Sequence, residues 1–165
     1  MRVKGLTLLE MLLVVALLAL LAQISLPAFA DLLHRKRADS YMQQFSRHLS
    51  FARIQAASSQ QSVILCPRLG TECQPNWENH PIFMLMQDPA TDSEHLLRQL
   101  PGVSHGHRLA YSRSQVQFRR DGSLDALENG TFYYCPPASF NWHYRLVLNQ
   151  AGRQRLNFVT ERCPF

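Results

Sequence analysis

The sequence predicts an α+β protein in which one long N-terminal helix packs on a largely antiparallel β-sheet head. No Gly or Pro occurs between Pro27 and Pro67, so a helix that starts in the apolar N-terminal stretch can continue to about Ser59. Beyond that point short apolar runs alternate with turn residues, which is typical of strands. No segment there has the helical spacing of a βαβ unit, and this favours antiparallel pairing.

Residues 6–30 form the apolar half of the predicted helix. Twelve apolar residues follow one another without a break in Met11–Ala22, and the apolar character continues to Ala30. A run of roughly 20 such residues is long enough to span a bilayer core. Arg2 and Lys4 precede the run, and positive charge favours a cytoplasmic location for the short end. We therefore expect residues 6–30 to be a transmembrane segment, with the rest of the chain on the far side.

Residues 31–60 form an amphipathic second half of the helix. Apolar residues recur there at three- and four-residue steps, which places them on one helix face. They are Ala38, Tyr41, Phe45, Leu49, Ala52 and Ala56. Polar residues such as Arg37 and Arg47 fall largely on the other side. We expect the apolar face to pack under the sheet as core.

Residues 61–165 form the β-rich head. The candidate strands are Val63–Cys66, Ile82–Gln87, His95–Leu100, Val116–Arg119, Thr131–Cys135, Tyr144–Asn149 and Arg155–Thr160. Asp121-Gly122 follows one of these runs, and Asn149 to Gly152 separates the last two as a hairpin turn.

Charge is distributed unevenly along the head. The chain has 17 Lys and Arg against 12 Asp and Glu, a formal net charge of +5. Cys66–Leu97 contains one Arg and five acidic residues, whereas residues 98–165 contain nine Arg and four acidic residues. The Arg-rich half is a candidate surface for a polyanion, because guanidinium groups make bidentate contacts with phosphates. The alternative is an ordinary solvated surface.

Four cysteines, Cys66, Cys73, Cys135 and Cys163, allow three disulfide pairings. None forms a C-x-x-C motif, and disulfides are favoured over a metal site in a chain with a membrane or secretory N-terminus. Sequence order favours Cys66–Cys73, which closes a local loop, and Cys135–Cys163, which ties down the last residues.

The N-terminal segment has two interpretations. Ala28-Phe29-Ala30 matches the small-x-small cleavage site of an ordinary secretory signal. In the second interpretation cleavage occurs early and the apolar helix stays. Glu10 favours the second, because a carboxylate in an apolar helix is costly and marks a function with a defined partner.

The segment Lys4-Gly5-Leu6-Thr7-Leu8-Leu9-Glu10, followed by the apolar run, resembles the class III signal of type IV pilins and type II secretion pseudopilins. The resemblance implies that residues 1–5 are a leader, that a prepilin peptidase cuts after Gly5, and that Leu6 is then N-methylated. It also implies that Glu10 pairs with the N-terminal amine of a neighbouring subunit, since a buried charge needs a partner of opposite sign. Pro27 matches the family's helix-bending proline.

The head is similar to the GspH/FimT branch of this family, whose motifs occur here in the same order. They are Cys66-Pro67, Cys73, Trp77, Ile82–Met86, Phe118 to Gly122, Phe132–Cys135 and Gly152-Arg153-Gln154-Arg155. One departure is His80-Pro81, where the family often has a glycine after the Trp. The resemblance covers nearly the whole chain and implies a type IV pilin-like fold.

The segment Gly152–Arg155 carries the candidate binding chemistry. Residues two apart on an extended strand point to the same side, so Arg153 and Arg155 can present two guanidinium groups together, and two such forks suit successive phosphates. Gly152 allows a turn or a close approach to a ligand. The resemblance implies that this GRxR motif contacts DNA. Supporting charges would come from Arg162, Arg119 and Arg120. The alternative is that the arginines stabilise the hairpin.

Such binding should not depend on base sequence, because no recognition helix is expected and phosphate contacts dominate non-specific affinity. Four aromatic residues lie near the basic stretch. They could stack on single-stranded bases, but we expect most of them to form the core of the sheet. They are Tyr133, Tyr134, Trp142 and Tyr144.

These features predict a minor pilin of a type IV pilus that binds DNA non-specifically and supports DNA uptake and pilus assembly. Its partners would be other pilin subunits, prepilin peptidase, the inner membrane and DNA. It would lie in the inner membrane with its head in the periplasm, and in the assembled pilus at the cell surface. The alternative is a structural minor pilin or a type II secretion pseudopilin that primes or caps the filament without binding DNA.

Catalysis finds little support in the sequence. No G-x-S-x-G, P-loop or H-E-x-x-H motif is present. His105 and His107 flank a Gly, which favours a solvated pair over a metal site. We expect no enzymatic activity, no cofactor and no metal. A rival hypothesis, a secreted enzyme, would require cleavage after Ala30.

Overall fold

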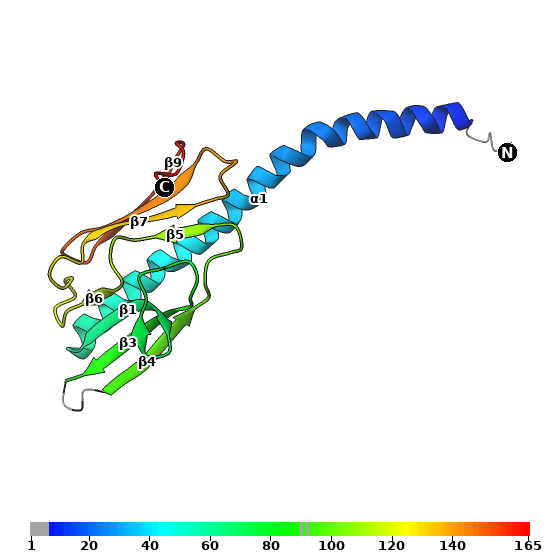
Figure 1. Ribbon diagram of the computed structural model, residues 1–165. Helices are drawn as coiled ribbons and strands as arrows, with labels where there is room; N and C mark the ends of the chain where they lie inside the picture. Colours follow the sequence, from blue (N-terminus) through cyan, green and yellow to red (C-terminus); the bar gives the residue numbers. More distant parts are fainter. Residues whose placement is uncertain (1–6, 90, 92) are drawn as a thin grey trace. The chain divides into compact units, whose positions relative to one another are not determined.

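The computed structural model describes residues 7–89, 91 and 93–165. Gly5 and Leu6, the expected cleavage site, lie outside the described residues. Contacts divide the chain into two units, residues 1–36 and residues 37–165. Along the described residues one helix is followed by nine strands (Figure 1).

Helix α1 (Leu8–Ser59) begins at a Thr-x-x-Glu capping sequence. The Glu10 N–H donates to the Thr7 side chain, with 3.3 Å between Glu10 N and Thr7 Oγ1. Thr7 thereby satisfies a backbone donor that the first helical turn leaves unpaired. A carboxylate in the first turn also interacts favourably with the helix dipole. Glu10 therefore has a local role in starting the helix, besides the intersubunit role expected from the sequence.

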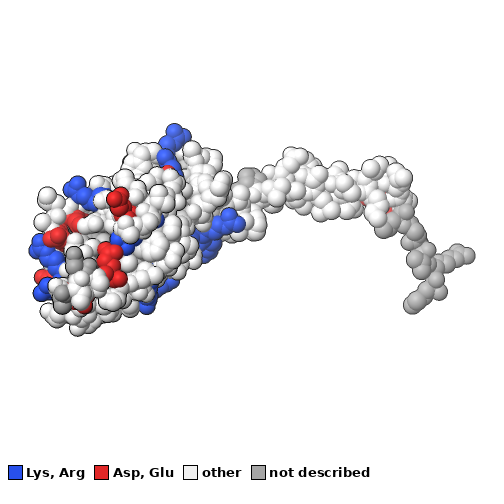
Figure 2. Space-filling view, turned by 60° about the horizontal axis from the view of Figure 1, so that its bottom comes forward, with Lys and Arg blue, Asp and Glu red and all other residues white. Residues whose placement is uncertain are grey.

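The N-terminal part of α1 carries the apolar run. Large apolar side chains from Leu8 to Leu21 are exposed, and this half of the helix shows almost no charged atoms on the face in Figure 2. Among the described residues, no single helix is both long and apolar enough to cross a membrane. The bent pair Leu8–Gln23 and Ala28–Ser59 meets the length and composition requirement together.

Within residues 37–165, the second half of α1 buries the face that the sequence predicts. Its fully buried side chains are Ala38, Met42, Phe45, Leu49, Ala52 and Ala56. Tyr41, the remaining member of the predicted face, is partly buried and packs against the core. The polar face, with Arg37 and Arg47, is exposed.

The head consists of two antiparallel sheets (Figure 1). The first sheet has the order β2-β1-β3-β4, with β6 also paired to β1. Its strands are β1 (Ser62–Leu69), β2 (Glu72–Cys73), β3 (Ile82–Asp88), β4 (Ser93–Leu100) and β6 (Val116–Phe118). The second sheet has the order β5-β7-β8-β9. Its strands are β5 (Arg108–Ala110), β7 (Gly130–Cys135), β8 (His143–Leu148) and β9 (Gln154–Val159).

All seven strands expected from the sequence are present, within a few residues at each end. A single sheet was expected from the sequence, whereas the structure divides the strands into two sheets. β2 and β5, of two and three residues, were not expected from the sequence. The predicted fold class, a long helix on an antiparallel β-rich head, is confirmed.

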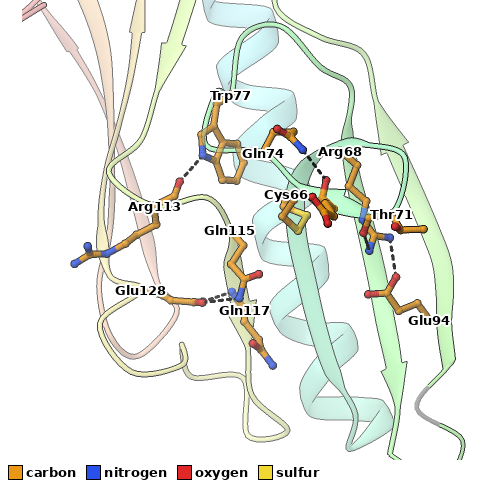
Figure 3. The surroundings of a disulfide bond; sticks show 12 residues. Cys66, Arg68, Thr71, Gln74, Trp77, Glu94, Arg113, Gln115, Gln117 and Glu128 are labelled. Carbon is orange, nitrogen blue, oxygen red and sulfur yellow. Dashed lines mark hydrogen bonds and ion pairs between the residues drawn. A yellow bond between two sulfur atoms is a disulfide. The ribbon is translucent and has the colours of Figure 1, made fainter.

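An aromatic cluster joins the helix to both halves of the head. The Phe45 ring of α1 lies 4.9 Å from the Phe132 ring of β7, and Phe132 lies 4.9 Å from Trp77, which follows β2. The Trp77 indole N–H donates to the Arg113 carbonyl oxygen at 2.6 Å (Figure 3). Edge-to-face aromatic pairs are worth about 0.5–1.5 kcal/mol beyond their area burial. The cluster therefore fixes the second sheet against the helix.

Two disulfides brace the loops of the head. They join Cys66 to Cys73 and Cys135 to Cys163, with Cα–Cα distances of 5.5 Å and 5.8 Å. These are the pairs that sequence order favours. The first closes the turn between β1 and β2, and the second ties the last residues to the end of β7.

The turn between β8 and β9 packs on the turn after β6. Gly152 adopts a φ of +70° and is buried. A Cβ atom built on it would lie 2.4 Å from the Gly122 carbonyl oxygen and 3.2 Å from Arg53 Cδ. Arg53 of α1 in turn donates from Nε to the Gly122 carbonyl oxygen at 3.3 Å. The two turns and the helix therefore meet at a place that only a glycine can occupy.

Glu128 is a half-buried carboxylate in the loop before β7. It accepts hydrogen bonds from Gln115 Nε2 at 3.1 Å and from the Gln117 backbone N–H (Figure 3). Burial raises the pKa of Glu128, although these two hydrogen bonds act in the opposite direction. The Glu128 carboxylate thus holds β6 to the loop, but its partial burial removes water from the charged group and so costs free energy.

Gly152→Ala should destabilise the fold by more than the roughly 1–3 kcal/mol of a strained backbone conformation, because its Cβ would also overlap the Gly122 carbonyl group. The matched control is Gly70→Ala. Gly70 has a similar φ of +68° but no atom within 4 Å of its added Cβ. Urea denaturation of the full chain in non-ionic detergent measures both. Equal losses in the two variants would contradict the packing role of Gly152.

Glu128→Gln should stabilise the fold relative to wild type, and the gain should grow from pH 4 to pH 7. Because the pKa of Glu128 is raised on folding, its protonated form favours the folded state, and that contribution is lost as pH rises through the folded-state pKa. Gln keeps an oxygen for the Gln117 N–H and carries no charge. Denaturant titrations across this pH range measure the difference, and a gain that shrinks with rising pH would refute the assignment.

Candidate functional site

The turn of the β8–β9 hairpin holds the predicted GRxR segment in one conformation. The Gly152 N–H donates to the Asn149 carbonyl oxygen at 2.9 Å, and the Asn149 N–H donates to the Arg153 carbonyl oxygen at 3.0 Å. The Asn149 side chain also accepts from the Arg153 N–H at 2.9 Å. Asn149–Gly152 is thus the hairpin turn that the sequence predicts. Gly152 itself is buried against Gly122, so packing alone accounts for a glycine at this position.

Arg153 and Arg155 lie on the solvent face of this hairpin. Arg155 is opposite Val147 in the register, and Asn157 is opposite Arg145. Alternation therefore places Arg145 on the same face as the two GRxR arginines. These residues line a shallow groove of about 460 Å³. Its full lining is Arg145, Val147, Asn149, Arg153, Gln154, Arg155 and Asn157.

The groove gathers three exposed guanidinium groups. Arg145 and Arg155 are diagonal neighbours across the strand pair, a relation that separates residues by about 7–8 Å. The structure records no ion pair for Arg145, Arg153 or Arg155 with any described residue. Their like charges therefore stand close together with their hydrogen-bond donors available, which is an arrangement that favours a polyanion.

Arg145 lies outside the GRxR motif and was not predicted as a site residue, although the alternation of apolar and polar residues in β8 indicates that it is exposed. In β8 the residues Tyr144, Leu146 and Leu148 are buried while Arg145 and Val147 are exposed. This alternation can be read from the sequence of Tyr144–Asn149. The pairing of β8 with β9, which brings Arg145 beside Arg155, requires the register.

Arg119 and Arg120 lie on the neighbouring turn, and their situations differ. Arg119 donates from Nε and Nη2 to Asp125 Oδ1, at 3.0 Å and 2.7 Å, and this hydrogen bonding lowers the pKa of Asp125. Arg120 is exposed. The turn is joined to the hairpin because the Leu124 N–H donates to the Gln150 carbonyl oxygen at 3.0 Å. Arg119 is therefore engaged in a local ion pair, and Arg120 is the better placed supporting charge.

Arg162 is not brought to the same end of the hairpin. It follows β9, whose six residues Gln154–Val159 separate it from Arg153. At about 3.3 Å per residue, that distance is roughly 20 Å or more. Arg162 is exposed beside Cys163, near the disulfide to Cys135. It can extend a basic surface along the strand, but it does not join the groove.

Three of the four aromatic residues near the basic stretch belong to the core. Tyr134, Trp142 and Tyr144 are buried, as the sequence favours for most of these residues. Tyr133 is only partly buried, and it lies opposite Arg145 in the pairing of β7 with β8. It is therefore the member of the set that faces outward beside the groove.

The described part of the chain offers neither a cluster of metal ligands nor a free thiol. It has no group of three or more His, Cys, Asp or Glu that could hold a metal ion, and all four cysteines are in disulfides. His107 is buried and packs its ring 5.3 Å from that of Tyr134. The His105-Gly106-His107 segment is therefore partly structural.

Comparison with known proteins gives a consistent picture. The profile of the family described as "Type II transport protein GspH" matches residues 42–152. The minor pilin FimU of Pseudomonas aeruginosa has a similar structure, with 20% identity, a TM-score of 0.59 and coverage of 74% of this chain and 90% of that one. The minor pseudopilin EpsH of the Vibrio cholerae type II secretion system matches with 15% identity, a TM-score of 0.54 and coverage of 73% and 96%. A search of curated proteins found no match.

Because both structures are at most 20% identical to this chain, they establish its fold alone. Membership of the family rests on the family profile. That profile spans well over half of the chain, including residues 42–59 of α1 and every strand up to the hairpin turn. The long helix on two antiparallel sheets is the architecture that FimU and EpsH share with this chain. The chain therefore belongs to the GspH/FimT family of type IV pilin-like minor pilins and pseudopilins.

Proposed function

We propose that this chain is a minor pilin of a type IV pilus that binds DNA without regard to base sequence. Its primary contacts are Arg153 and Arg155, and in this role it supports DNA uptake as well as pilus assembly. Family membership supports a place in a pilus or secretion filament, and the finer assignment rests on the hairpin groove.

The single observation that carries the proposal is the group of three guanidiniums on one face of a rigid hairpin. Arg145, Arg153 and Arg155 line one groove and are not engaged in ion pairs with described residues. Charge-assisted hydrogen bonds from Arg to phosphate are strong and bidentate. Surfaces that neutralise successive phosphates bind nucleic acid with little sequence preference.

The described helix offers no means of reading bases in a groove. α1 buries one face of its second half as core, and the exposed face there carries Arg37, Ser40, Gln44 and Arg47 on a helix fixed beneath the sheets. Sequence readout in duplex DNA generally needs an element that enters the major groove. Phosphate contacts from the hairpin alone account for a non-specific interaction.

Assembly would use the N-terminal helix. In this proposal a prepilin peptidase cuts between Gly5 and Leu6, Leu6 is N-methylated, and the apolar residues 6–30 hold the protein in the inner membrane until it joins the filament. Glu10 then pairs with the N-terminal amine of a neighbouring subunit, and Pro27, which lies within α1, bends the helix. The head would lie in the periplasm and then at the surface of the pilus.

A second candidate is a structural minor pilin or pseudopilin that binds only other subunits. It is favoured by β4, an edge strand that pairs with β3 alone. Most of its side chains are exposed, including Leu96 at 56%. An exposed strand edge with apolar side chains is suited to a protein partner.

Arg153→Gln combined with Arg155→Gln should weaken DNA binding roughly tenfold or more at low salt, because two phosphate contacts are lost. The slope of log affinity against log salt should also fall by roughly 1.5–2. Fluorescence anisotropy with a labelled duplex and the full chain in non-ionic detergent measures both quantities.

The matched control for this pair is Arg37→Gln combined with Arg47→Gln. It removes the same charge from the exposed face of α1 and should leave most of the affinity. Equal affinity of the hairpin variant and wild type would refute the assigned contacts. Absence of DNA binding by wild type at low salt would favour the structural candidate.

Mature protein purified from cells that contain a prepilin peptidase should begin at Leu6 and carry one added methyl group at its N-terminus. Intact-mass and N-terminal peptide mass spectrometry measure this directly. Gly5→Val should leave the leader attached, since in this proposal the peptidase cuts directly after the glycine. A mature chain that begins at Asp31 would show ordinary secretion instead and would overturn the assembly role of residues 6–30.

A further inference from the structure

The basic groove is continuous with an aromatic hollow on the same face of the second sheet. Tyr133 of β7 is opposite Arg145 of β8, and Thr131 is opposite Val147. Thr131 and Tyr133 line a hollow of about 340 Å³ together with Phe165 and residues 110–112. Arg145 and Val147 line the basic groove. The two concave regions therefore meet along the β7–β8 pairing.

Two aromatic rings form the exposed wall of this hollow. The rings of Tyr133 and Phe165 are 5.3 Å apart and nearly perpendicular, at 85°. The Phe165 side chain is 54% exposed. Exposed apolar side chains are normally scattered singly, whereas Phe165 lies against a second aromatic ring. Ser112 and Thr131 add hydroxyl groups to the lining. The face of an exposed aromatic ring, with a few hydrogen-bonding groups beside it, is suited to a nucleobase.

Phe165 is held in place from two sides. The Cys135–Cys163 disulfide anchors the segment two residues before it to the end of β7. The Arg108 guanidinium donates to the Phe165 carbonyl oxygen. An aromatic surface that is already ordered loses little conformational entropy when a ligand stacks on it.

We infer that this face binds single-stranded DNA in preference to duplex, with bases stacked on Tyr133 and Phe165 while Arg145, Arg153 and Arg155 contact the phosphates. The inference rests on the proposed function and deepens it. A single strand exposes base faces that aromatic side chains can cover, and guanidinium groups beside them follow the backbone. A duplex buries its base faces in its own stack, so only the guanidinium groups would contribute to binding it.

The choice of occupant follows from charge and shape together. Three guanidiniums that form no ion pair with a described residue favour a polyanion over an apolar peptide. The aromatic wall adds nothing for a polyanion without flat apolar groups. A single-stranded nucleic acid supplies both features in one chain, with alternating phosphates and bases.

The test uses the full chain in non-ionic detergent and fluorescence anisotropy with three labelled probes. The probes are a short single strand, the duplex of the same sequence, and an abasic strand of the same length that keeps the phosphates but lacks bases. The variants are Tyr133→Leu and Phe165→Leu. Phe158→Leu is the matched control, because Phe158 is also a partly exposed aromatic residue of the second sheet, at 41%, but by alternation lies on its opposite face.

Wild type should bind the single strand more tightly than the duplex or the abasic strand. Tyr133→Leu and Phe165→Leu should each weaken single-strand binding about tenfold and leave duplex and abasic binding unchanged, whereas Phe158→Leu should change none of the three. The double variant Arg153→Gln and Arg155→Gln should weaken binding of all three probes. Phe165→Leu, at an exposed position, provides the result if Tyr133→Leu does not fold, as judged by circular dichroism.

Two other outcomes separate the inference from the proposed function. If the leucine variants bind the single strand like wild type, or lose duplex and abasic affinity equally, stacking is refuted while the arginine contacts stand. If wild type binds none of the probes at low salt, or if the arginine variant binds all of them like wild type, both the proposed function and the stacking inference are overturned.

Discussion

The contact between Gly152 and Gly122 is the constraint on which the geometry of the candidate site depends. Both glycines have positive φ angles, +70° and +78°, and the Gly122 carbonyl oxygen also accepts from Arg53 of α1. The hairpin of the second sheet, the turn after β6 of the first sheet and the helix therefore meet at one point. Because Arg153 follows Gly152 directly, its backbone position is set by this packing. A side chain at position 152 would move the turn and the guanidinium groups that it presents.

The β8–β9 hairpin separates a packed face from an exposed basic face by alternation. On β8, Leu146 and Leu148 are buried in the core, while Arg145 and Val147, which alternate with them, face solvent. The inner face attaches the hairpin to the aromatic cluster around Phe45, and the outer face is thereby held rigid. A rigid surface loses less entropy on binding than a flexible Arg-rich tail does. In the proposed function the helix and core would contribute to DNA recognition indirectly, by ordering the backbone from which the arginines project.

Much of this architecture was predictable because it depends on the periodicity of apolar residues along the chain. The candidate site depends instead on which strands pair with each other. The apolar face of α1, seven strands and the Asn149–Gly152 turn all follow from local patterns. The division into two sheets and the proximity of Arg145 to Arg155 depend on which strands pair, and a single sequence does not encode that locally. Arg119 was grouped with the binding residues by charge alone, and its ion pair with Asp125 depends on the conformation of the turn. The packing of Gly152 against Gly122 was likewise invisible, because the two residues are far apart in sequence.

The arginines of the head differ in whether an acidic residue compensates them. Arg68 pairs with Glu94 at 2.7 Å (Figure 3), and Arg119 pairs with Asp125 at 2.7 Å, so acidic residues compensate these two arginines. Arg145, Arg153 and Arg155 have no such partner among the described residues. Like charges held this close repel one another, and the repulsion is relieved when an anionic chain binds and releases its counterions. A filament contact with another subunit would leave this repulsion in place unless the partner were acidic, and for that reason the groove supports a nucleic-acid ligand more strongly than it supports a purely structural role.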